Sequence, residues 1–421
     1  MTLASPRLCF VVPRFFEGLA GGAETLLSNL AVEAAHRGCN VELLATCARD
    51  NRTWENVFSA GAERYKGVRL HRFPVDSRNL DVWIPIQSAI HDGQSVSYDD
   101  QLRWMEESVN SRAMYRYIAE NQSRFDAIIL GPYLFGTTFW GSQIAPHKTI
   151  LVPCLHDEPY AYLDIIATMF RSVGGCIFNA LPEQQLACSL YGSVEGGVVG
   201  MGFKSLPNQS GIASRYFEHD FPYVLYLGRK ETGKNVHLLV DYFCEGKDRG
   251  AIPESCKLVV LGGGSFDDLH RQDALSRSDV IDLPHVSEEE KERIIAGALC
   301  MCQPSCNESF SIVLMESWQK RVPVVVHAEC PVTRFHVEES AGGLYFGSAF
   351  EFAGVVTYLL ARSQERRSMG DAGFSYVKDR YSWDSVMKRF SDTLRDLIPS
   401  LAVSNGHCEQ ANGCDRGGSL P

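Results

Sequence analysis

The chain has 421 residues, of which 45% are hydrophobic and 22% charged, and its formal net charge is −11. This length suits two domains, and the composition is that of a soluble α/β protein rather than of a disordered or fibrous one. The acidic balance argues against nucleic acid as the main partner, because phosphate backbones are bound through a basic field.

Neither a secretory signal nor a membrane span is predicted. The first apolar run, Leu8 to Val12, is too short for a signal and is followed at once by Pro13. The most lipid-like run, Phe125 to Pro146, is interrupted by polar residues and by Asp126. We therefore expect a cytoplasmic protein whose 14 cysteines are reduced.

Residues 7 to 200 alternate strand and helix patterns, which is typical of a doubly wound parallel sheet. A loop ending in Gly21-Gly22-Ala23-Glu24 leads from the first strand into a helix that Gly38 ends. The fingerprint G-x-G-x-x-G is absent, which argues against a nicotinamide enzyme. The strands of this half are predicted at residues 8–12, 41–45, 68–73, 125–130, 149–153, 175–178 and 196–199.

Three features of this half allow more than one interpretation. Residues 76–99 have no clear period and are expected to form a long surface excursion, where substrate selectivity often resides. His156 follows a strand, where parallel sheets place ligands, but a histidine there can also serve local hydrogen bonding. A basic stretch forms either a solvated face or a dock for an anionic membrane. That stretch comprises Arg64, Lys66, Arg69, Arg72 and Arg78.

A linker is predicted at residues 206–221, where periodicity is lost and Pro207 and Gly211 occur. A second strand–helix series follows it, so the fold class is α/β with two Rossmann-like domains in tandem. Residues 400–421 are expected to be disordered. Strands of the second half are predicted at 223–227, 257–261, 280–283, from Cys300, and at 322–326. Its helices are predicted through Phe243, near 266–275, at 287–298, from Ser309, at 350–361, at 365–380 and up to Leu397.

Charged residues gather at the carboxyl ends of strands in the second half. Arg229 and Lys234 lie in the loop after its first strand, and Glu308 and Glu316 flank the start of the helix predicted from Ser309. Sheet topology brings such ends to one edge. Two cations facing the free amides of a helix start would bind a diphosphate, the arginine as a fork and the lysine as a point charge.

A metal is not predicted. Cys300, Cys302 and Cys306 form a local cluster, but it lacks paired C-x-x-C spacing and an evident fourth ligand, so ordinary strand packing is the preferred interpretation. The Gly262-Gly263-Gly264 sequence is interpreted as a tight turn, with a nucleotide contact as the alternative.

These motifs together resemble those of a retaining glycosyltransferase of the GT-B fold, in glycosyltransferase family 4 (glycosyl transferases group 1). The resemblance spans most of residues 7–398. It is carried by GGAE at 21–24, the pair His156-Asp157, GRKETGK at 228–234, and PSCNESFSIVLMES at 304–317 followed by VPVVV.

The resemblance implies two Rossmann-like domains that face each other across a cleft. Residues 1–205 would form the acceptor domain, residues 222–380 the nucleotide-sugar (donor) domain, and residues 381–399 a helix that crosses back to the first domain. The implied partners are a nucleotide-sugar donor and a glycan or lipid-linked acceptor, with peripheral contact to the cytoplasmic face of the plasma membrane as a further expectation. No cofactor is implied.

The same resemblance implies roles for individual residues. Arg229 and Lys234 would hold the donor diphosphate. Glu316 would bind the ribose hydroxyls, and Glu308 would lie against the donor sugar near the reacting carbon. His156 would reach the donor sugar, while Gly21 and Gly22 would approach the diphosphate or the acceptor. The backbone expected to touch phosphate and sugar comprises Ser309, Phe310, Ser311, Ile312 and Val313.

One departure from the family pattern is that Ser309 and Ser311 stand where glycines usually flank the phenylalanine, so we expect an altered donor fit on an intact cradle. The implied reaction is metal-independent transfer of a hexose, with retention of configuration, in surface polysaccharide biosynthesis. Two alternatives remain, a non-catalytic nucleotide-sugar-binding partner of another transferase and a nucleotide-sugar 2-epimerase.

Overall fold

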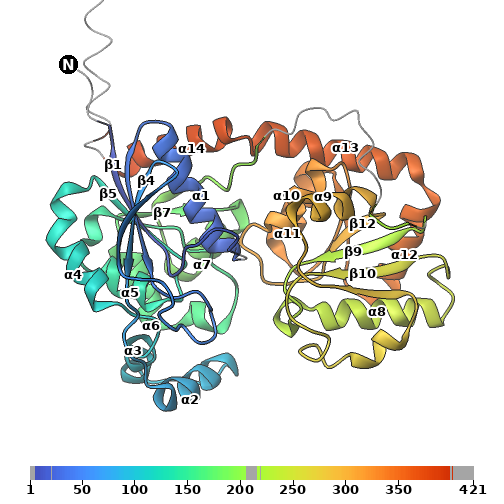
Figure 1. Cartoon of the computed structure of the whole chain (residues 1–421), viewed down its shortest axis with the longest axis horizontal. Coiled ribbons are helices and arrows are strands. Elements are labelled where there is room, and N and C mark those ends of the chain that lie inside the picture. The colour runs from blue at the N-terminus through green and yellow to red at the C-terminus, as the bar shows by residue number, and fades with distance from the viewer. Residues whose placement is uncertain (1–4, 20, 205–215, 219, 399–400, 402–421) are drawn as a thin grey trace, which may run out of the picture. The chain divides into compact units, whose positions relative to one another are not determined.

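The computed structural model describes residues 5–19, 21–204, 216–218, 220–398 and 401. These residues fall into two compact units, which divide between Met201 and Gly202 and again between Ser385 and Val386 (Figure 1). Most of the predicted linker at 206–221 and nearly all of the predicted tail at 400–421 lie outside the described residues.

The described part of the first unit contains one eight-stranded sheet in the order β3-β4-β2-β1-β5-β6-β7-β8. All neighbouring pairs are parallel except β3 and β4, which are antiparallel. The predicted doubly wound sheet is thus confirmed, but β3 was missed because its residues are almost all exposed and show no alternation. The strands are β1 (Arg7–Val11), β2 (Asn40–Thr46), β3 (Gly61–Tyr65), β4 (Val68–Phe73), β5 (Ala127–Leu130), β6 (Thr149–Leu151), β7 (Gly175–Phe178) and β8 (Gly196–Val198).

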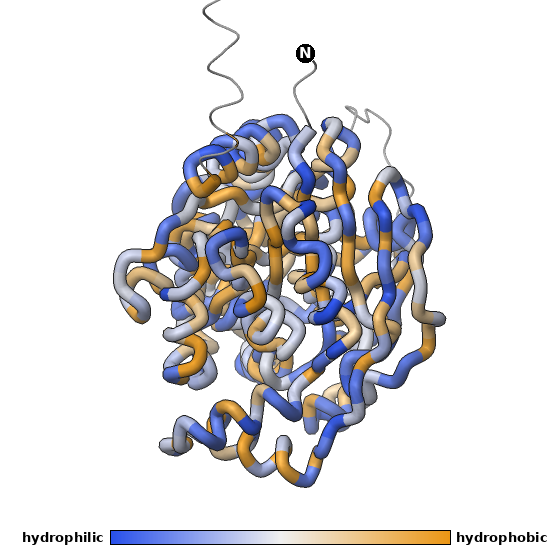
Figure 2. The backbone as a smooth tube through the Cα atoms, turned by 90° about the vertical axis from the view of Figure 1, so that its left-hand side faces the viewer, coloured by the Kyte–Doolittle hydropathy of each residue, from blue (hydrophilic) through white to orange (hydrophobic). Residues whose placement is uncertain are grey.

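Residues 76–99, which were predicted to form a long surface excursion without a clear period, contain the helix α2 (Leu80–His91) and the start of α3 at Tyr98. Ile90 is the one buried residue of α2, and Pro85 lies within the helix. In Figure 2, apolar and polar residues are intermixed along the helices at the bottom of the view, where Figure 1 labels α2 and α3. Trp83 and Ile86 nevertheless pack against the core. The helices are α1 (Gly22–His36), α2 (Leu80–His91), α3 (Tyr98–Glu106), α4 (Arg112–Asn121), α5 (Gly136–Ser142), α6 (Asp164–Ser172) and α7 (Leu181–Tyr191), with 3-10 turns η1 (Gln122–Arg124), η2 (Pro146–Lys148) and η3 (Pro159–Tyr162).

The apolar run at residues 125–146 is divided between β5, α5 and η2. Among the residues that the structure describes, no helix combines the length and the apolar character that a membrane span requires. The cysteines in this described part are all free, as predicted.

The last helix, α14 (Trp383–Leu397), returns to the first unit, to which its residues from Val386 onward belong. The ring of Phe390 stacks on that of Phe10 at 6.4 Å. The Arg389 guanidinium donates hydrogen bonds of 3.2 and 2.7 Å to the carbonyl oxygen of Val199. The amphipathic pattern predicted a helix here. The structure shows that its apolar face packs on the sheet of the first unit.

The second unit contains a six-stranded, all-parallel sheet in the order β11-β10-β9-β12-β13-β14 within the described residues. Its strands are β9 (Tyr223–Leu227), β10 (Lys257–Leu261), β11 (Val280–Leu283), β12 (Cys300–Gln303), β13 (Val324–His327) and β14 (Gly343–Phe346). The first three were predicted with these same bounds because both faces of a parallel sheet are covered, which gives short apolar runs.

The helices of the second unit depart from the prediction in three places. The helix predicted near residues 266–275 is a series of turns ending in a 3-10 segment, the helix predicted from Ser309 begins only at Ile312, and α11 was not predicted. The elements are η4 (Thr232–Lys234), α8 (Val236–Asp248), η5 (Gln272–Ser276), α9 (Glu288–Gly297), α10 (Ile312–Gln319), α11 (Pro331–Ser340), α12 (Ala349–Ala361) and α13 (Ser363–Arg380).

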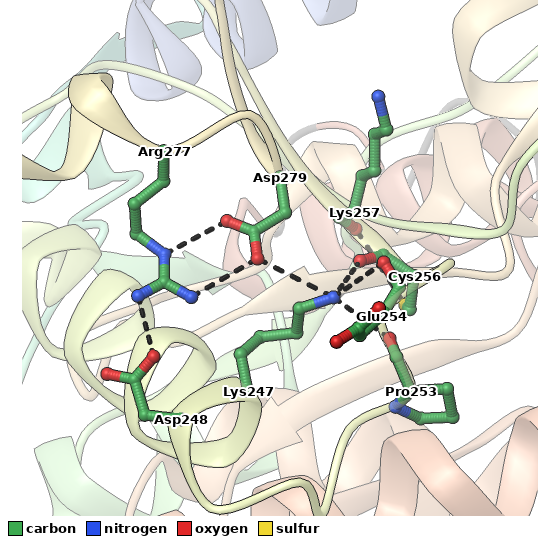
Figure 3. A network of polar contacts seen from close by, with 8 residues as sticks. All are labelled: Lys247, Asp248, Pro253, Glu254, Cys256, Lys257, Arg277 and Asp279. Carbon is green, nitrogen blue, oxygen red and sulfur yellow. Dashed lines mark hydrogen bonds and ion pairs between the residues drawn. The ribbon is translucent and has the colours of Figure 1, made fainter.

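A buried lysine ties α8 to the loop before β10. The Lys247 ammonium donates to the carbonyl oxygens of Pro253, Glu254 and Cys256 at 2.8 to 3.0 Å and lies 3.5 Å from Asp279 (Figure 3). Its side chain is 5% exposed. All three ammonium hydrogens thus have acceptors, which a buried charge requires.

Replacing this lysine should destabilise the protein. Lys247→Met keeps the side-chain volume but leaves three carbonyls without their donor, so we expect a loss of about 2 to 4 kcal/mol in the free energy of unfolding. Urea denaturation followed by circular dichroism measures it. Lys388→Met is the control, because Lys388 is 82% exposed and pairs weakly, at 3.9 Å, with Asp392. Equal stability of the two variants would contradict the role given to Lys247.

Candidate functional site

The carboxyl ends of β9 and β12, which are adjacent strands, bring a lysine and a glutamate together. Lys234 lies after β9 and Glu308 after β12, and the Lys234 Nζ to Glu308 Oε1 distance is 2.8 Å. Lys234 also donates to the carbonyl oxygen of Asn307 at 3.2 Å. The sequence predicted that these two side chains share one edge, and the structure places them in contact.

Asn235, which sequence reasoning missed, holds the two loops together. Its side-chain amide donates to the carbonyl oxygen of Pro304 at 3.2 Å and to Cys306 Sγ at 3.3 Å. Its backbone is left-handed, with φ +55°. Asparagine tolerates that conformation better than most residues, and this preference is the only local signal that marked the position.

The other two cations of the loop, Arg229 and Lys230, lie in different surroundings. The Arg229 side chain is 53% exposed and pairs with Glu231 at 3.1 Å, and among the described residues it makes no hydrogen bond or ion pair with Lys234 or Glu308. Lys230 is buried and donates to the carbonyl oxygens of Gly262 and Leu283 at 2.7 and 2.9 Å. The middle cation of the motif therefore has a structural role, which the sequence did not reveal.

The Gly262-Gly263-Gly264 segment makes a tight turn, which is the interpretation that the sequence favoured. A Cβ atom on Gly262 would lie 2.1 Å from the carbonyl oxygen of Gly228, and φ is +139° at this residue. Only glycine allows the two loops to approach so closely.

Glu316 lies in the second turn of α10 and faces α9. Its Oε1 atom is 2.9 Å from Lys291 Nζ, which also lies 2.7 Å from Glu288. Burial raises the pKa of the Glu316 carboxyl, and Lys291 opposes this shift. The structure therefore gives Glu316 a partner, Lys291, that was not predicted, and one carboxylate oxygen remains for another donor.

The start of α10 differs from the predicted cradle because Ser311 is left-handed, with φ +65°. The helix begins after it, so the first free helical amides belong to Ile312 and Val313 rather than to Ser309. Phe310 is 2% exposed and packs edge-on against Tyr381 at 5.1 Å between ring centres, so its side chain anchors the segment in the core.

Two features of Ser311 are unfavourable in free energy and would be absent with glycine. Its left-handed backbone conformation is sterically unfavourable for a residue with a Cβ atom, and its buried Oγ has no hydrogen-bond partner among the described residues. The structure thus gives a physical reason for glycine at this position of the motif, because glycine pays no steric cost in this conformation.

Ser311→Gly should therefore stabilise the chain. We expect the free energy of unfolding to rise by about 1 kcal/mol, since relief of backbone strain and of the buried hydroxyl outweighs the greater entropy of the unfolded chain. Thermal and urea denaturation measure it. Ser311→Ala is the matched control, because it removes the hydroxyl and keeps the Cβ atom. A variant with glycine less stable than that with alanine would contradict the assignment to strain.

In the first unit, Gly21 is explained by packing. Arg14 and Glu24 form a buried two-point ion pair, with nitrogen–oxygen distances of 2.8 and 3.1 Å. A Cβ atom on Gly21 would lie 2.1 Å from the Glu24 carboxylate, whereas one on Gly22 would meet nothing within 4 Å. Gly21 is thus needed for the ion pair, and the predicted ligand contacts of both glycines stay predictions.

His156 follows β6 in the first unit, as predicted. Its Nδ1 atom lies 3.5 Å from Glu158 Oε1, and the same carboxylate oxygen accepts a hydrogen bond of 2.7 Å from the Tyr133 hydroxyl. Its side chain is 26% exposed. A ring that is positioned by a neighbouring carboxylate yet open to solvent is available to a ligand.

A buried glutamate positions the loop that carries His156. Glu183, which is 1% exposed, accepts the backbone N–H of Leu155 at 2.7 Å and that of Asn179 at 2.5 Å. Burial raises the pKa of the Glu183 carboxyl to about 8, against the lowering effect of these backbone donors.

This raised pKa predicts a pH dependence of stability. Between the ordinary value of 4.5 and about 8, the unfolded chain binds fewer protons at this residue than the folded chain, so stability falls as pH rises. The slope is up to about 1.4 kcal/mol per pH unit. Glu183→Gln should lack this contribution in urea denaturation at pH 5 and pH 8, while the exposed control Glu120→Gln should keep it. Parallel pH profiles for wild type and Glu183→Gln would contradict the shift.

Two of the five basic residues at 64–78 donate hydrogen bonds to backbone carbonyl oxygens. Arg72 donates to the carbonyl oxygen of Phe15 at 2.6 Å, and Arg78 donates to that of Glu107 at 3.0 Å. These two serve the fold of the unit, and membrane contact by the stretch stays a prediction.

Comparison with known proteins matches most of the second unit to a family model. Residues 212–375 match the family model described as glycosyl transferases group 1. A curated relative, the D-inositol 3-phosphate glycosyltransferase of Corynebacterium aurimucosum, is 26% identical over 199 residues, which are 45% of this chain and 46% of that protein. The match therefore spans about half the length of this relative.

Solved structures resemble nearly the whole chain in fold. Sucrose-phosphate synthase from Thermosynechococcus elongatus matches with a TM-score of 0.70 at 15% identity, over 94% of this chain and 100% of that one. HepE from Anabaena, solved in complex with UDP and glucose, matches with a TM-score of 0.65 at 16% identity, over 93% of this chain and 100% of that one. The predicted GT-B fold is thereby confirmed.

Proposed function

We propose that this chain of GT-B fold is a member of the glycosyl transferases group 1 family, and that it transfers a hexose from a nucleotide diphosphate sugar to a hydroxyl group with retention of configuration. The acceptor is proposed to be a glycan or a lipid-linked glycan of surface polysaccharide biosynthesis. The observation that carries the proposal is the Lys234–Glu308 pair at the carboxyl ends of two adjacent parallel strands.

Lys234 suits the role of holding the donor diphosphate. An ammonium group has three hydrogens, and its described partners are Glu308 and the carbonyl oxygen of Asn307. One hydrogen therefore remains for a phosphate oxygen. In the reaction, the bond between the anomeric carbon and the diphosphate breaks, and a fixed positive charge stabilises the negative charge that develops on the leaving group.

The free amides at the start of α10 add to this stabilisation. Ile312 and Val313 follow Glu308 by a few residues, and a helix start favours an anion through its unpaired N–H groups and dipole. Glu308 is proposed to lie against the donor sugar, where its negative carboxylate stabilises the positive charge that develops at the anomeric carbon. Arg229, which is exposed, is proposed to turn to the diphosphate when the donor binds.

The remaining assignments follow the same proposal. Glu316 is proposed to accept hydrogen bonds from the ribose through the oxygen that Lys291 does not occupy. His156 of the first unit is proposed to contact the donor sugar. The acceptor hydroxyl oxygen bonds to the anomeric carbon and loses its proton, and all charges in this account come from the chain itself without a metal.

Substitution of the pair tests the catalytic proposal. Lys234→Ala and Glu308→Gln should each lower kcat by about a hundredfold or more at saturating donor, because each removes fixed charge at the reacting groups. Product formation is measured by chromatography, and circular dichroism checks the fold. Lys378→Ala, an exposed lysine of α13, is the control that should keep full activity. Full activity of either site variant under donor excess would overturn the assignment.

The same assay separates the two alternatives. A non-catalytic binding partner would bind the nucleotide sugar but show no turnover as the isolated protein. A 2-epimerase would convert the donor to its epimer without any acceptor, and nuclear magnetic resonance of the sugar detects that product. Transfer that requires an acceptor hydroxyl contradicts both.

A thermal-shift screen identifies the nucleotide. UDP, GDP and ADP are compared, with UDP favoured because HepE was solved with it. A ligand at 100 times its Kd stabilises the folded state by about 2.7 kcal/mol, so the correct nucleotide should raise Tm. Lys234→Ala should lose this rise. A rise of equal size in Lys234→Ala would show that the nucleotide binds elsewhere.

A further inference from the structure

A cluster of metal-binding side chains lies beside the proposed donor site and has no part in it. The ligand atoms of Cys306, His327 and Glu329 all lie within 4.8 Å of one another. Cys306 follows β12, and the other two come from the end of β13 and the turn after it. Because these strands are parallel neighbours, their carboxyl ends bring the three residues together.

This ligand set differs from the cysteine cluster considered in the sequence. Cys300 and Cys302 are fully buried within β12 and do not join Cys306 in a group of ligands among the described residues. The histidine and the glutamate lie more than 20 positions after Cys306 in the chain. A local spacing motif therefore could not predict that they lie close to this cysteine.

The separation of the first two ligands fits a single ion. Cys306 Sγ lies 3.4 Å from His327 Nδ1. With zinc–sulfur and zinc–nitrogen bonds of about 2.3 and 2.0 Å, a tetrahedral angle puts the two ligand atoms roughly 3.5 Å apart. The two atoms that now contact each other could therefore both bind one ion with little movement of the backbone.

The surroundings hold these two ligands in place. His327 is 5% exposed, and its ring packs edge-on against Phe346 with 5.3 Å between ring centres. The backbone N–H of Glu329 donates to Nδ1 at 3.3 Å, so this ring nitrogen is an acceptor, and an ion bound there would replace that hydrogen bond at its single lone pair. The Asn235 amide donates to Cys306 Sγ at 3.3 Å, in the manner of a group that orients a metal ligand.

The third side chain of this group is that of Glu329. The residue is exposed, and its carboxylate forms no ion pair within the described part of the chain. A carboxylate at most 4.8 Å from the other two ligand atoms needs only a side-chain rotation to complete the set.

We propose that Cys306 Sγ, His327 Nδ1 and a Glu329 carboxylate oxygen bind one Zn²⁺ ion, with a fourth position open to solvent. A thiolate, an imidazole and a carboxylate form a ligand set for zinc, whereas calcium and magnesium prefer oxygen ligands alone. On binding, the Cys306 S–H bond breaks, the sulfur bonds to the ion, and the proton passes to the solvent.

Occupancy of this site would fix the loop that carries Glu308. Cys306 precedes Glu308 by two positions, and its sulfur contacts Asn235, the residue after Lys234. An ion bound to Cys306 and to the end of β13 therefore links the two loops of the proposed donor site to a third strand. The metal site itself does not depend on the proposed function, because its test measures binding.

Cobalt is the probe for this site, because zinc has no visible spectrum. The full chain, kept reduced with a non-chelating phosphine, is titrated with Co²⁺ and then with Zn²⁺. We expect one Co²⁺ per chain, a thiolate-to-cobalt charge-transfer band, the visible absorption of a tetrahedral ion, and loss of both when Zn²⁺ displaces it. Zn²⁺ should also raise Tm by mass action.

Variants assign the signal to the three residues. Cys306→Ser should abolish the charge-transfer band, and Glu329→Gln, at an exposed residue that should not disturb folding, should weaken Co²⁺ binding roughly tenfold or more. Cys188→Ser is the matched control, because Cys188 is an exposed cysteine of the first unit and should be dispensable. Metal-free circular dichroism confirms that each variant is folded.

Three outcomes would overturn the proposal. They are a wild-type chain without a stoichiometric Co²⁺ complex, a charge-transfer band that survives in Cys306→Ser, and a band that is lost in Cys188→Ser. Unchanged affinity in Glu329→Gln would remove the third ligand from the site. An inactive transferase with an intact Co²⁺ spectrum would instead count against the proposed function alone.

Discussion

The candidate site depends on the adjacency of β9 and β12. In the sequence, 72 residues separate Leu227 at the end of β9 from Cys300 at the start of β12. The parallel pairing of the two strands nevertheless places both carboxyl ends at one edge of the sheet. Lys234 and Glu308 can then form a contact of 2.8 Å, and Asn235 bonds the second loop to the first. The Lys234 ammonium is thus fixed in position, and a fixed charge can stabilise an anion with little rearrangement.

Residues of one chemical type have different roles in this chain because their distances from strand ends differ. In the motif at 228–234, Arg229 is exposed, Lys230 is buried against backbone carbonyls, and Lys234 faces Glu308. A similar contrast holds for the paired glycines, since Gly21 makes room for a buried ion pair and Gly22 meets nothing. A motif therefore combines residues that build the loop with residues that meet the ligand.

Two features of this chain lie within a few residues of Glu308. Ser311 occupies a left-handed position that suits glycine, and Cys306 contacts a histidine from the next strand. Both features shape the segment between β12 and α10 and leave the Lys234–Glu308 contact in place. This short loop therefore joins the candidate site to the side chains of the proposed metal site.

The sequence by itself determined the two Rossmann-like sheets and the strands at 223–227, 257–261 and 280–283, because buried parallel strands give short apolar runs. It also placed Lys234 and Glu308 at one sheet edge, because both follow strands of the same predicted sheet. It could not place β3 or α2, whose residues are mostly exposed and carry no period. Only the tertiary structure decided the start of α10 at Ile312, the Lys291 partner of Glu316 and the Cys306–His327 contact. Such pairs join residues distant in the chain, and local patterns record burial but not which partner a buried or charged side chain will meet.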